Sequence, residues 1–182
     1  MFNFIFKKNL MLKSSFFIVF FFILISVKSF AEIFLFVNSK SVKNLRFIGQ
    51  VQVADGDTIR KGKLKIRLHG IDAPEKKQLC TDLNNELYAC GLLSSAFLKK
   101  IINNSDVYCK GKNKDRYGRL IAICYANEIN LNSTMVKEGW AIAYRYYSDD
   151  YINEEESAKK NNRGIWEGAF LEPYIWRKNN SF

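Results

Sequence analysis

Alternating apolar and charged positions mark residues 47–68 as β-structure. Leu64, Ile66 and Leu68 are separated by charged side chains, which is the period of two expected of a strand with one buried face. Residues 47–54 and 58–61 carry shorter runs of the same kind, and glycines at 56 and 62 supply turns between them. The pattern predicts three consecutive strands, with Arg67 on the polar face of the third.

The second half of the chain mixes helical and extended patterns. Leu93, Ala96, Phe97 and Ile101 have the spacing of an amphipathic helix. We predict helices over residues 92–102, 130–138 and 154–162, strands over 107–110 and 120–126, a charged hairpin over 111–119 and a packed tail over 165–176. Five strands with three helices predict an α+β fold, and five strands of this size can close into a small barrel.

The first 31 residues have the layout of a secretory signal peptide. Three lysines precede an apolar run over residues 16–25, and Ser29-Phe30-Ala31 offers small residues for cleavage. The run is shorter than the roughly 20 residues of a spanning helix. An uncleaved membrane anchor is the alternative, because apolar residues resume at 33–37.

The predicted organisation is therefore a signal peptide (1–31), a linker (32–45), a single domain (46–176) and a tail (177–182). It predicts a periplasmic or secreted protein, with membrane contact only if the N-terminal segment is retained. The net charge of +10 favours a polyanionic partner, either nucleic acid or an anionic membrane surface.

The four cysteines indicate disulfides. Behind an export signal, an even count is typical of an oxidising compartment, and one histidine in the chain argues against zinc. Proximity favours Cys80 with Cys90 and Cys109 with Cys124 over the other two connectivities. Four reduced thiols are the alternative if the chain is not exported.

Several charged residues have the chemistry needed to open a phosphodiester with water. Asp57 and Asp72 are carboxylates that flank the third strand, and hard oxygen ligands favour calcium or magnesium over zinc. Arg67 and Arg119 each offer a planar fork of donors to phosphate oxygens. Glu75 remains as a base for the attacking water.

In their order and spacing, these residues resemble the staphylococcal nuclease (thermonuclease) family, of the exported bacterial type, over about residues 46–176. The resemblance is carried by Asp55-Gly56-Asp57-Thr58, Arg67-Leu68, Ile71-Asp72-Ala73-Pro74-Glu75, Asp115-Arg116-Tyr117-Gly118-Arg119, Gly139-Trp140-Ala141 and Gly164-Ile165-Trp166. Each segment alone is weak, since Asp-Gly is also a common turn. Together they are specific.

The resemblance implies a five-stranded OB-type β-barrel with three helices and a calcium-dependent endonuclease acting on DNA and RNA. It assigns Asp57, Asp72 and the backbone carbonyl of Ala73 to Ca²⁺, with Mg²⁺ less favoured. The implied catalytic residues are Arg67, Glu75 and Arg119, and the implied substrate contacts are Arg116, Tyr117 and Tyr144.

The alternative is a noncatalytic OB-type module that binds nucleic acid or a protein. The presence of all three charged catalytic positions argues against it. A further alternative is action on another phosphorylated or anionic polymer at the cell envelope.

Overall fold

The computed structural model describes residues 45–180. The predicted signal peptide and nearly all of the predicted linker lie outside the described residues. The described residues belong to one unit of the chain, Ser41–Phe182, and only this unit is considered below.

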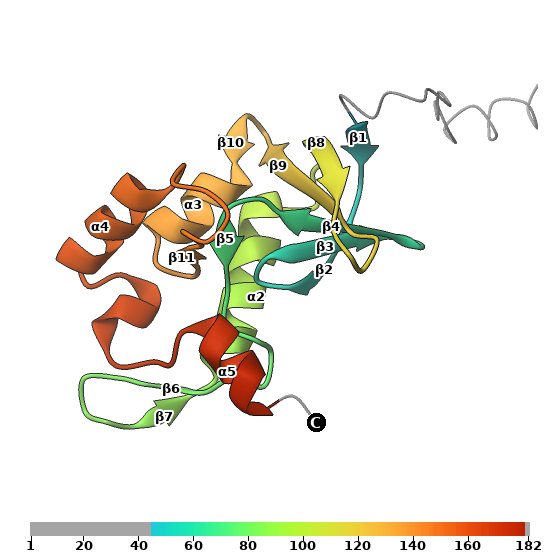
Figure 1. Cartoon of the computed structure of the whole chain (residues 1–182). Coiled ribbons are helices and arrows are strands. Elements are labelled where there is room, and N and C mark those ends of the chain that lie inside the picture. Colours follow the sequence, from blue (N-terminus) through green and yellow to red (C-terminus); the bar gives the residue numbers. More distant parts are fainter. Residues whose placement is uncertain (1–44, 181–182) are drawn as a thin grey trace, which may run out of the picture. The chain divides into compact units, whose positions relative to one another are not determined.

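A curled sheet forms the first layer of the structure (Figure 1). Along its path the strand order is β1-β8-β9-β4-β3-β2, and β10 pairs with β9. Parallel pairing occurs between β4 and β9, while the other pairs are antiparallel. The strands are β1 (Leu45–Gly49), β2 (Gln52–Asp55), β3 (Thr58–Lys61), β4 (Leu64–Leu68), β8 (Val107–Lys114), β9 (Leu120–Ala126) and β10 (Ile129–Asn130).

The single strand predicted over residues 47–54 is two strands in the structure. β1 pairs with β8 and β2 pairs with β3, so the chain changes partner within the two residues that separate them. Gly49 makes this bend with a φ of 146°, a conformation that other residues rarely adopt. β1 and β2 are the two edge strands at opposite ends of this strand order. Only two residues connect them, so the sheet must curl to bring its two edges together.

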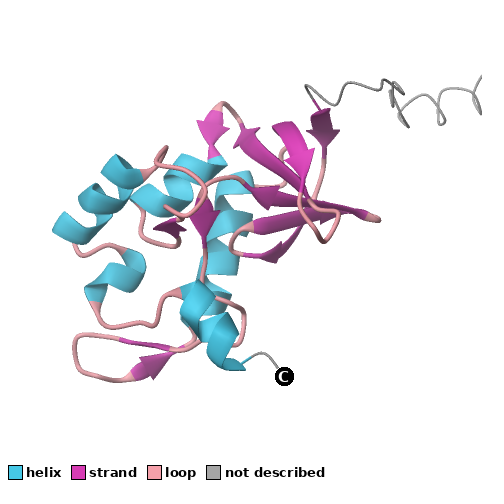
Figure 2. Cartoon of the chain, viewed as in Figure 1, coloured by secondary structure: helices cyan, strands magenta, loops and turns pink. Residues whose placement is uncertain are grey.

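Within residues 45–180, four α-helices and one 3₁₀-helix accompany the sheet, and Figure 2 shows helices and sheet in different colours. They are α2 (Cys90–Ile102), α3 (Leu131–Lys137), α4 (Ile152–Lys160), η1 (Gly164–Glu167) and α5 (Pro173–Asn180). The three predicted helices are present, with their ends within two residues of the predicted ones. α5 is an additional helix, and the predicted boundary between domain and tail falls inside it.

The core lies between the sheet and α2 and α3. Ile66 and Leu68 of β4 are fully buried in it together with Leu98 of α2 and Met135 of α3. The predicted alternation of β4 is confirmed, because Arg67 reaches the opposite face. The α+β class and the OB-type sheet are also confirmed.

Short strands outside the main sheet hold the loops on which the site is built. β5 (Ile71–Asp72) pairs with β11 (Ile142–Ala143), and β6 (Cys80–Thr81) pairs with β7 (Leu87–Tyr88). Two-residue strands are too short to show an alternation in the sequence, which is why none of them was predicted.

Both predicted disulfides are present. Cys80 and Cys90 close the β6–β7 loop, and Cys109 and Cys124 are register partners on β8 and β9. All the cysteines of the described residues are therefore paired. Within residues 45–180, no helix has the length and apolar character needed to cross a membrane.

Candidate active site

Two buried aspartates meet at one arginine. Arg67 Nη1 lies 2.6 Å from Asp57 Oδ1, and Arg67 Nη2 lies 2.7 Å from Asp72 Oδ1. Asp57 belongs to the β2–β3 turn, Arg67 to β4 and Asp72 to β5. The turn and the two strands thus converge on a single guanidinium, whereas the sequence led us to expect the two carboxylates at a cation and Arg67 at the phosphate.

Local contacts fix the Asp57 carboxylate. Its Oδ2 accepts a hydrogen bond from the backbone N–H of Ala73 at 3.1 Å, and its Oδ1 accepts one from Thr58 Oγ1 at 2.9 Å. Gly56 permits this arrangement, because a Cβ at that position would overlap the side chains of Ser94 and Ala73. A glycine is required for the turn to lie this close to α2.

A second guanidinium, from α5, reaches Asp72 and Glu75. Arg177 binds both oxygens of Asp72, Nη1 to Oδ1 at 2.9 Å and Nη2 to Oδ2 at 3.0 Å. The same Nη1 also donates to Glu75 Oε1 at 3.0 Å. Three acidic side chains and two arginines therefore form one network, which we call the carboxylate cluster: Asp57, Asp72, Glu75, Arg67 and Arg177.

Burial and charge shift the pKa values within this cluster and at the nearby Asp55. Burial raises the pKa of Asp72 above its usual range despite its arginine partners. Burial, reinforced by the charge of Asp57, also raises the pKa of Asp55 to about 7. Burial works against charge on Arg67 and Arg177, but the neighbouring carboxylates outweigh it and raise both pKa values. Both guanidiniums therefore stay charged.

A cleft of about 1010 Å³ opens beside the cluster. Arg67, Glu75 and Arg177 line it together with Arg119, which lies in the β8–β9 hairpin turn. Further cations continue along its wall, namely Lys65, Lys110, Lys112 and Arg116. An anionic chain is the ligand that such a lining favours.

Asp115 holds Arg119 within the hairpin turn. Its Oδ1 accepts the backbone N–H groups of Tyr117 and Arg119, both at 2.9 Å, and its Oδ2 accepts Arg119 Nε at 2.7 Å. These bonds hold the pKa of Asp115 below its usual range, although burial acts in the opposite direction. Asp115 engages Nε rather than the two terminal nitrogens of Arg119.

Aromatic side chains stand along the same cleft. Tyr117 lies under Arg116 and Arg119, whose Cζ atoms are 4.8 and 5.5 Å from the ring centroid. Tyr144 contacts the rings of Tyr146, Tyr147 and Tyr174. The structure thus places all three predicted substrate contacts, Arg116, Tyr117 and Tyr144, on the cleft wall.

Two aspartates of the cluster are the carboxylates predicted to hold a cation. Asp57 and Asp72 offer hard oxygen atoms, the ligand type that Ca²⁺ and Mg²⁺ prefer. Within residues 45–180, no group of three or more His, Cys, Asp or Glu side chains is arranged to hold a metal ion. The donor chemistry is of the type that a hard cation prefers, and each of the four carboxylate oxygens accepts a hydrogen bond from Arg67, Arg177, Thr58 or the backbone of Ala73 in this structure.

Two site residues were missed from the sequence. Arg177 was assigned to the tail, and its neighbours in sequence carry no pattern that points to a site. Gln78 is fully buried and links the Glu75 loop to the residues before α5. A buried glutamine in a loop rich in lysine and leucine gives no signal before the fold is known.

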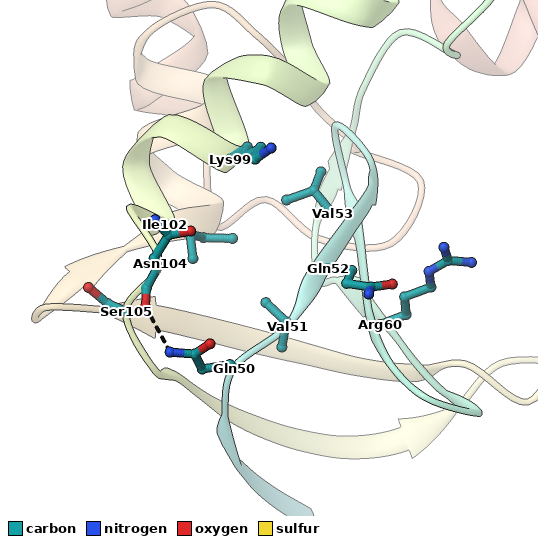
Figure 3. Close-up of a pocket in the computed structure, with 9 residues that line it drawn as sticks. All are labelled: Gln50, Val51, Gln52, Val53, Arg60, Lys99, Ile102, Asn104 and Ser105. Atoms are coloured by element: carbon teal, nitrogen blue, oxygen red, sulfur yellow. Dashed lines mark hydrogen bonds between the residues drawn. The ribbon is translucent and has the colours of Figure 1, made fainter.

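A second cavity of about 340 Å³ lies between β2 and the end of α2 (Figure 3). Gln50 and Lys99 are among its lining residues, and Gln50 Nε2 donates to the carbonyl of Asn104 at 3.1 Å. It shares no lining residue with the cleft, and no carboxylate lines it. Of these two cavities, only the cleft is lined by the carboxylates that a hydrolytic site needs.

These features define an OB-type α+β protein whose basic cleft meets a cluster of carboxylates and guanidiniums. A family model described as "Staphylococcal nuclease homologue" matches residues 65–168. The chain belongs to the staphylococcal nuclease family.

Three relatives illustrate the range of this similarity. The chain is 38% identical to an "Uncharacterized endonuclease" of Haemophilus influenzae, over 70% of this chain and 71% of the relative. It is 33% identical to a "Micrococcal nuclease" of Shigella flexneri, over 70% and 78% respectively. It is also 34% identical to the "Succinoglycan biosynthesis protein ExoI" of Rhizobium meliloti, over 65% of this chain and 64% of that protein.

Proposed function

We propose that this protein is an exported, calcium-dependent endonuclease that hydrolyses phosphodiester bonds in DNA, RNA or both. The observation that carries the proposal is the junction of Asp57 and Asp72 on Arg67 beside a cleft that Glu75 and Arg119 also line. Family membership and relatives named endonuclease and micrococcal nuclease support it.

The two arginines supply the phosphate-binding groups of the proposed reaction. Arg67 and Arg119 are planar donors, and each is aligned by a carboxylate at 2.6–2.7 Å. Prealigned guanidiniums stabilise the negative charge that grows on phosphate oxygens as water attacks. Arg119 keeps its terminal nitrogens for this purpose, because Asp115 engages Nε.

Glu75 takes the proton of the attacking water in this proposal. Its carboxylate is partly exposed at the cleft, whereas those of Asp57 and Asp72 are nearly or fully buried. A base must come within hydrogen-bond reach of its water, and of the three carboxylates Glu75 has the best access.

Asp57 and Asp72, with the carbonyl of Ala73, are the residues that would hold Ca²⁺. Calcium tolerates irregular oxygen ligands, whereas Mg²⁺ demands near-ideal octahedral geometry, so a site with two side-chain donors favours calcium. When bound, the cation adds positive charge at the phosphate oxygens.

Export rests on the cysteines. Both disulfides close within the described unit, and such bonds persist in oxidising compartments. The predicted signal peptide agrees with a periplasmic or secreted location.

The direct test is cleavage of single-stranded DNA and RNA by the protein that begins at Glu32, with Ca²⁺ or with a chelator. We expect internal cleavage with Ca²⁺ only, and loss of that cleavage in Arg119→Ala. Nucleic-acid binding without cleavage under all conditions would instead favour the noncatalytic OB-type module. The same assay is run with a phosphorylated polysaccharide as substrate. Cleavage of that polymer and not of DNA or RNA would indicate a protein that acts on other anionic polymers.

A further inference from the structure

The C-terminal helix α5 is fastened to the loop that carries Glu75. Gln78 Oε1 accepts the backbone N–H of Glu75 at 3.2 Å, and Gln78 Nε2 donates to the carbonyl of Leu171 at 2.6 Å. Gln78 is fully buried, and its two bonds lie partly within the protein. The segment entering α5 is thus fixed relative to Glu75 before the helix begins.

A ring contact holds the first turn of α5 against the cleft. Tyr174 stacks on Tyr144 with ring centroids 6.4 Å apart and an interplanar angle of 26°. Tyr144 lines the cleft, and Tyr174 precedes Arg177 by three residues. Residues three apart share a helix face, so the face that carries Tyr174 also presents Arg177 to the site.

Arg177 is the contact that joins Glu75 to Asp72. Its Nη1 lies 3.0 Å from Glu75 Oε1 and 2.9 Å from Asp72 Oδ1, while Nη2 lies 3.0 Å from Asp72 Oδ2. Two neighbouring carboxylates repel each other, and the shared guanidinium offsets this repulsion with three charge-assisted hydrogen bonds. Glu75 is therefore held in one orientation by a residue 102 positions away in sequence.

We propose that α5 is part of the active site and that Arg177 is a positioning residue, which orients Glu75 and places a positive charge against Asp72. This inference rests on the proposed nuclease function. Arg67 and Arg119 then serve the phosphate, whereas Arg177 serves the carboxylates.

The two roles of Arg177 have opposite consequences when it is removed. Glu75 loses its fixed orientation, so turnover slows. Asp72 loses a positive neighbour that repels and competes with any cation, so cation binding tightens. A residue needed only for folding would weaken both properties together.

The test compares Arg177→Ala and Arg177→Lys with wild type, using the full chain expressed with export. Arg163→Ala is the matched control, because Arg163 is equally exposed at 35% and pairs with Glu138 away from the cleft. The measurements are kcat and KM on single-stranded DNA at saturating Ca²⁺, and Ca²⁺ affinity from the rise in melting temperature on titration.

For Arg177→Ala we expect kcat to fall about ten- to hundredfold, as for other residues that orient a reacting group, with KM changed less than about twofold. Ca²⁺ affinity should rise about fivefold from the lost repulsion. Arg177→Lys keeps the charge but loses the fork, so wild-type Ca²⁺ affinity should return with only part of kcat. Methylguanidinium added to Arg177→Ala should restore turnover in part.

Unchanged or increased kcat in Arg177→Ala would overturn the inference, the latter by identifying α5 as a self-inhibiting element. Parallel losses of kcat and Ca²⁺ affinity would overturn it as well. If wild type and Arg163→Ala cleave DNA and Arg177→Ala matches them, only this inference fails. If wild type cleaves nothing, the proposed function fails and the inference falls with it.

Discussion

Two buried acids in this protein have similar partners and different surroundings. Asp72 binds Arg67 and Arg177 at 2.7–3.0 Å, and Glu155 binds Arg145 and Lys159 at 2.6 and 2.9 Å. Both carboxylates are almost fully withdrawn from solvent. A buried carboxylate with two basic partners therefore does not by itself indicate a catalytic site.

The surroundings separate the two. Glu155 also accepts the backbone N–H of Ala143 at 3.1 Å, and none of these residues lines the cleft. Acids outnumber bases around Asp72, where Asp57 and Glu75 share the same two arginines. The cluster around Asp72 has more acidic than basic side chains and lies beside a cleft, so it is suited to accept a cation and a substrate. The charge of Glu155 is already neutralised by Arg145 and Lys159.

Glu155 nevertheless contributes to the site indirectly, through the strand that pairs with β5. It fixes Ala143 of β11, and β11 pairs with β5 so that Ile142 is the register partner of Asp72. We therefore expect substitutions at the two clusters to have different consequences, kinetic at the first and structural at the second.

The largest effect is expected at the cleft. Arg119→Ala should lower kcat about 10²- to 10³-fold, the usual cost of removing one prealigned donor from a developing anion. Glu75→Gln should act similarly by removing the base. Steady-state cleavage of single-stranded DNA measures both.

Urea unfolding of Arg119→Ala is the control for that prediction. Arg119 is a hairpin residue whose partner Asp115 keeps its backbone bonds, so the free energy of unfolding should change by less than about 1 kcal/mol. A stable variant with wild-type kcat would contradict the role proposed for Arg119.

The reverse result is expected at Glu155. Glu155→Ala leaves the buried N–H of Ala143 without its acceptor, so unfolding should become easier by about 2–3 kcal/mol. Glu155→Gln keeps an acceptor and should cost less. Unfolding is measured in urea, and kcat is measured at a temperature where the variant is folded. A tenfold fall in kcat with unchanged stability would erase the distinction between the two clusters.

The sequence was informative where the chemistry is local. Asp57, Arg67, Asp72 and Glu75 lie within 19 residues, on short turns and strands whose order brings them together once the sheet forms. The alternation of β4 and the pairing of the cysteines were readable for the same reason. Short-range patterns report the face of a strand and the ends of a turn.

Long-range contacts could not be read from the pattern. Arg177 meets Asp72 across 105 residues, and it does so through a helix of eight residues whose charged end resembles a solvated tail. The split of β1 from β2 depends on β8 as a partner, which no feature of residues 45–55 specifies. In both cases a distant segment decides the role of a local one.

A smaller effect, on the affinity for nucleic acid, should distinguish the lysines of the cleft wall from the basic residues that bind Glu155. Replacing Lys110 and Lys112 by alanine removes two positive charges from the cleft wall, so nucleic-acid binding should weaken several-fold. The slope of log affinity against log salt should fall by about 1.4 for a single strand.

Arg145→Ala is the control for that measurement, because Arg145 pairs with Glu155 outside the cleft. Its salt slope should equal that of wild type. Binding by fluorescence anisotropy on a labelled single strand, with Ca²⁺ omitted to prevent cleavage, gives both slopes. Equal slopes in all three proteins would show that the hairpin lysines do not contact the substrate.

The smallest effect concerns the hairpin that presents Arg119. Asp115 accepts three hydrogen bonds, and they lower its pKa from the ordinary value of 3.8. A carboxylate whose pKa falls on folding stabilises the protein at any pH above its pKa in the unfolded chain. This stabilisation is lost as the pH falls through the pKa of the carboxylate in the folded protein. Asp115→Asn should therefore lower the free energy of unfolding by about 1 kcal/mol near neutral pH.

The difference in unfolding free energy between Asp115→Asn and wild type should shrink in urea titrations carried from about pH 7 to below 3.8, since protonation of Asp115 then removes the same charge. A difference that persisted unchanged at acid pH would mean that the charge of Asp115 does not hold the hairpin, and the alignment of Arg119 would need another source.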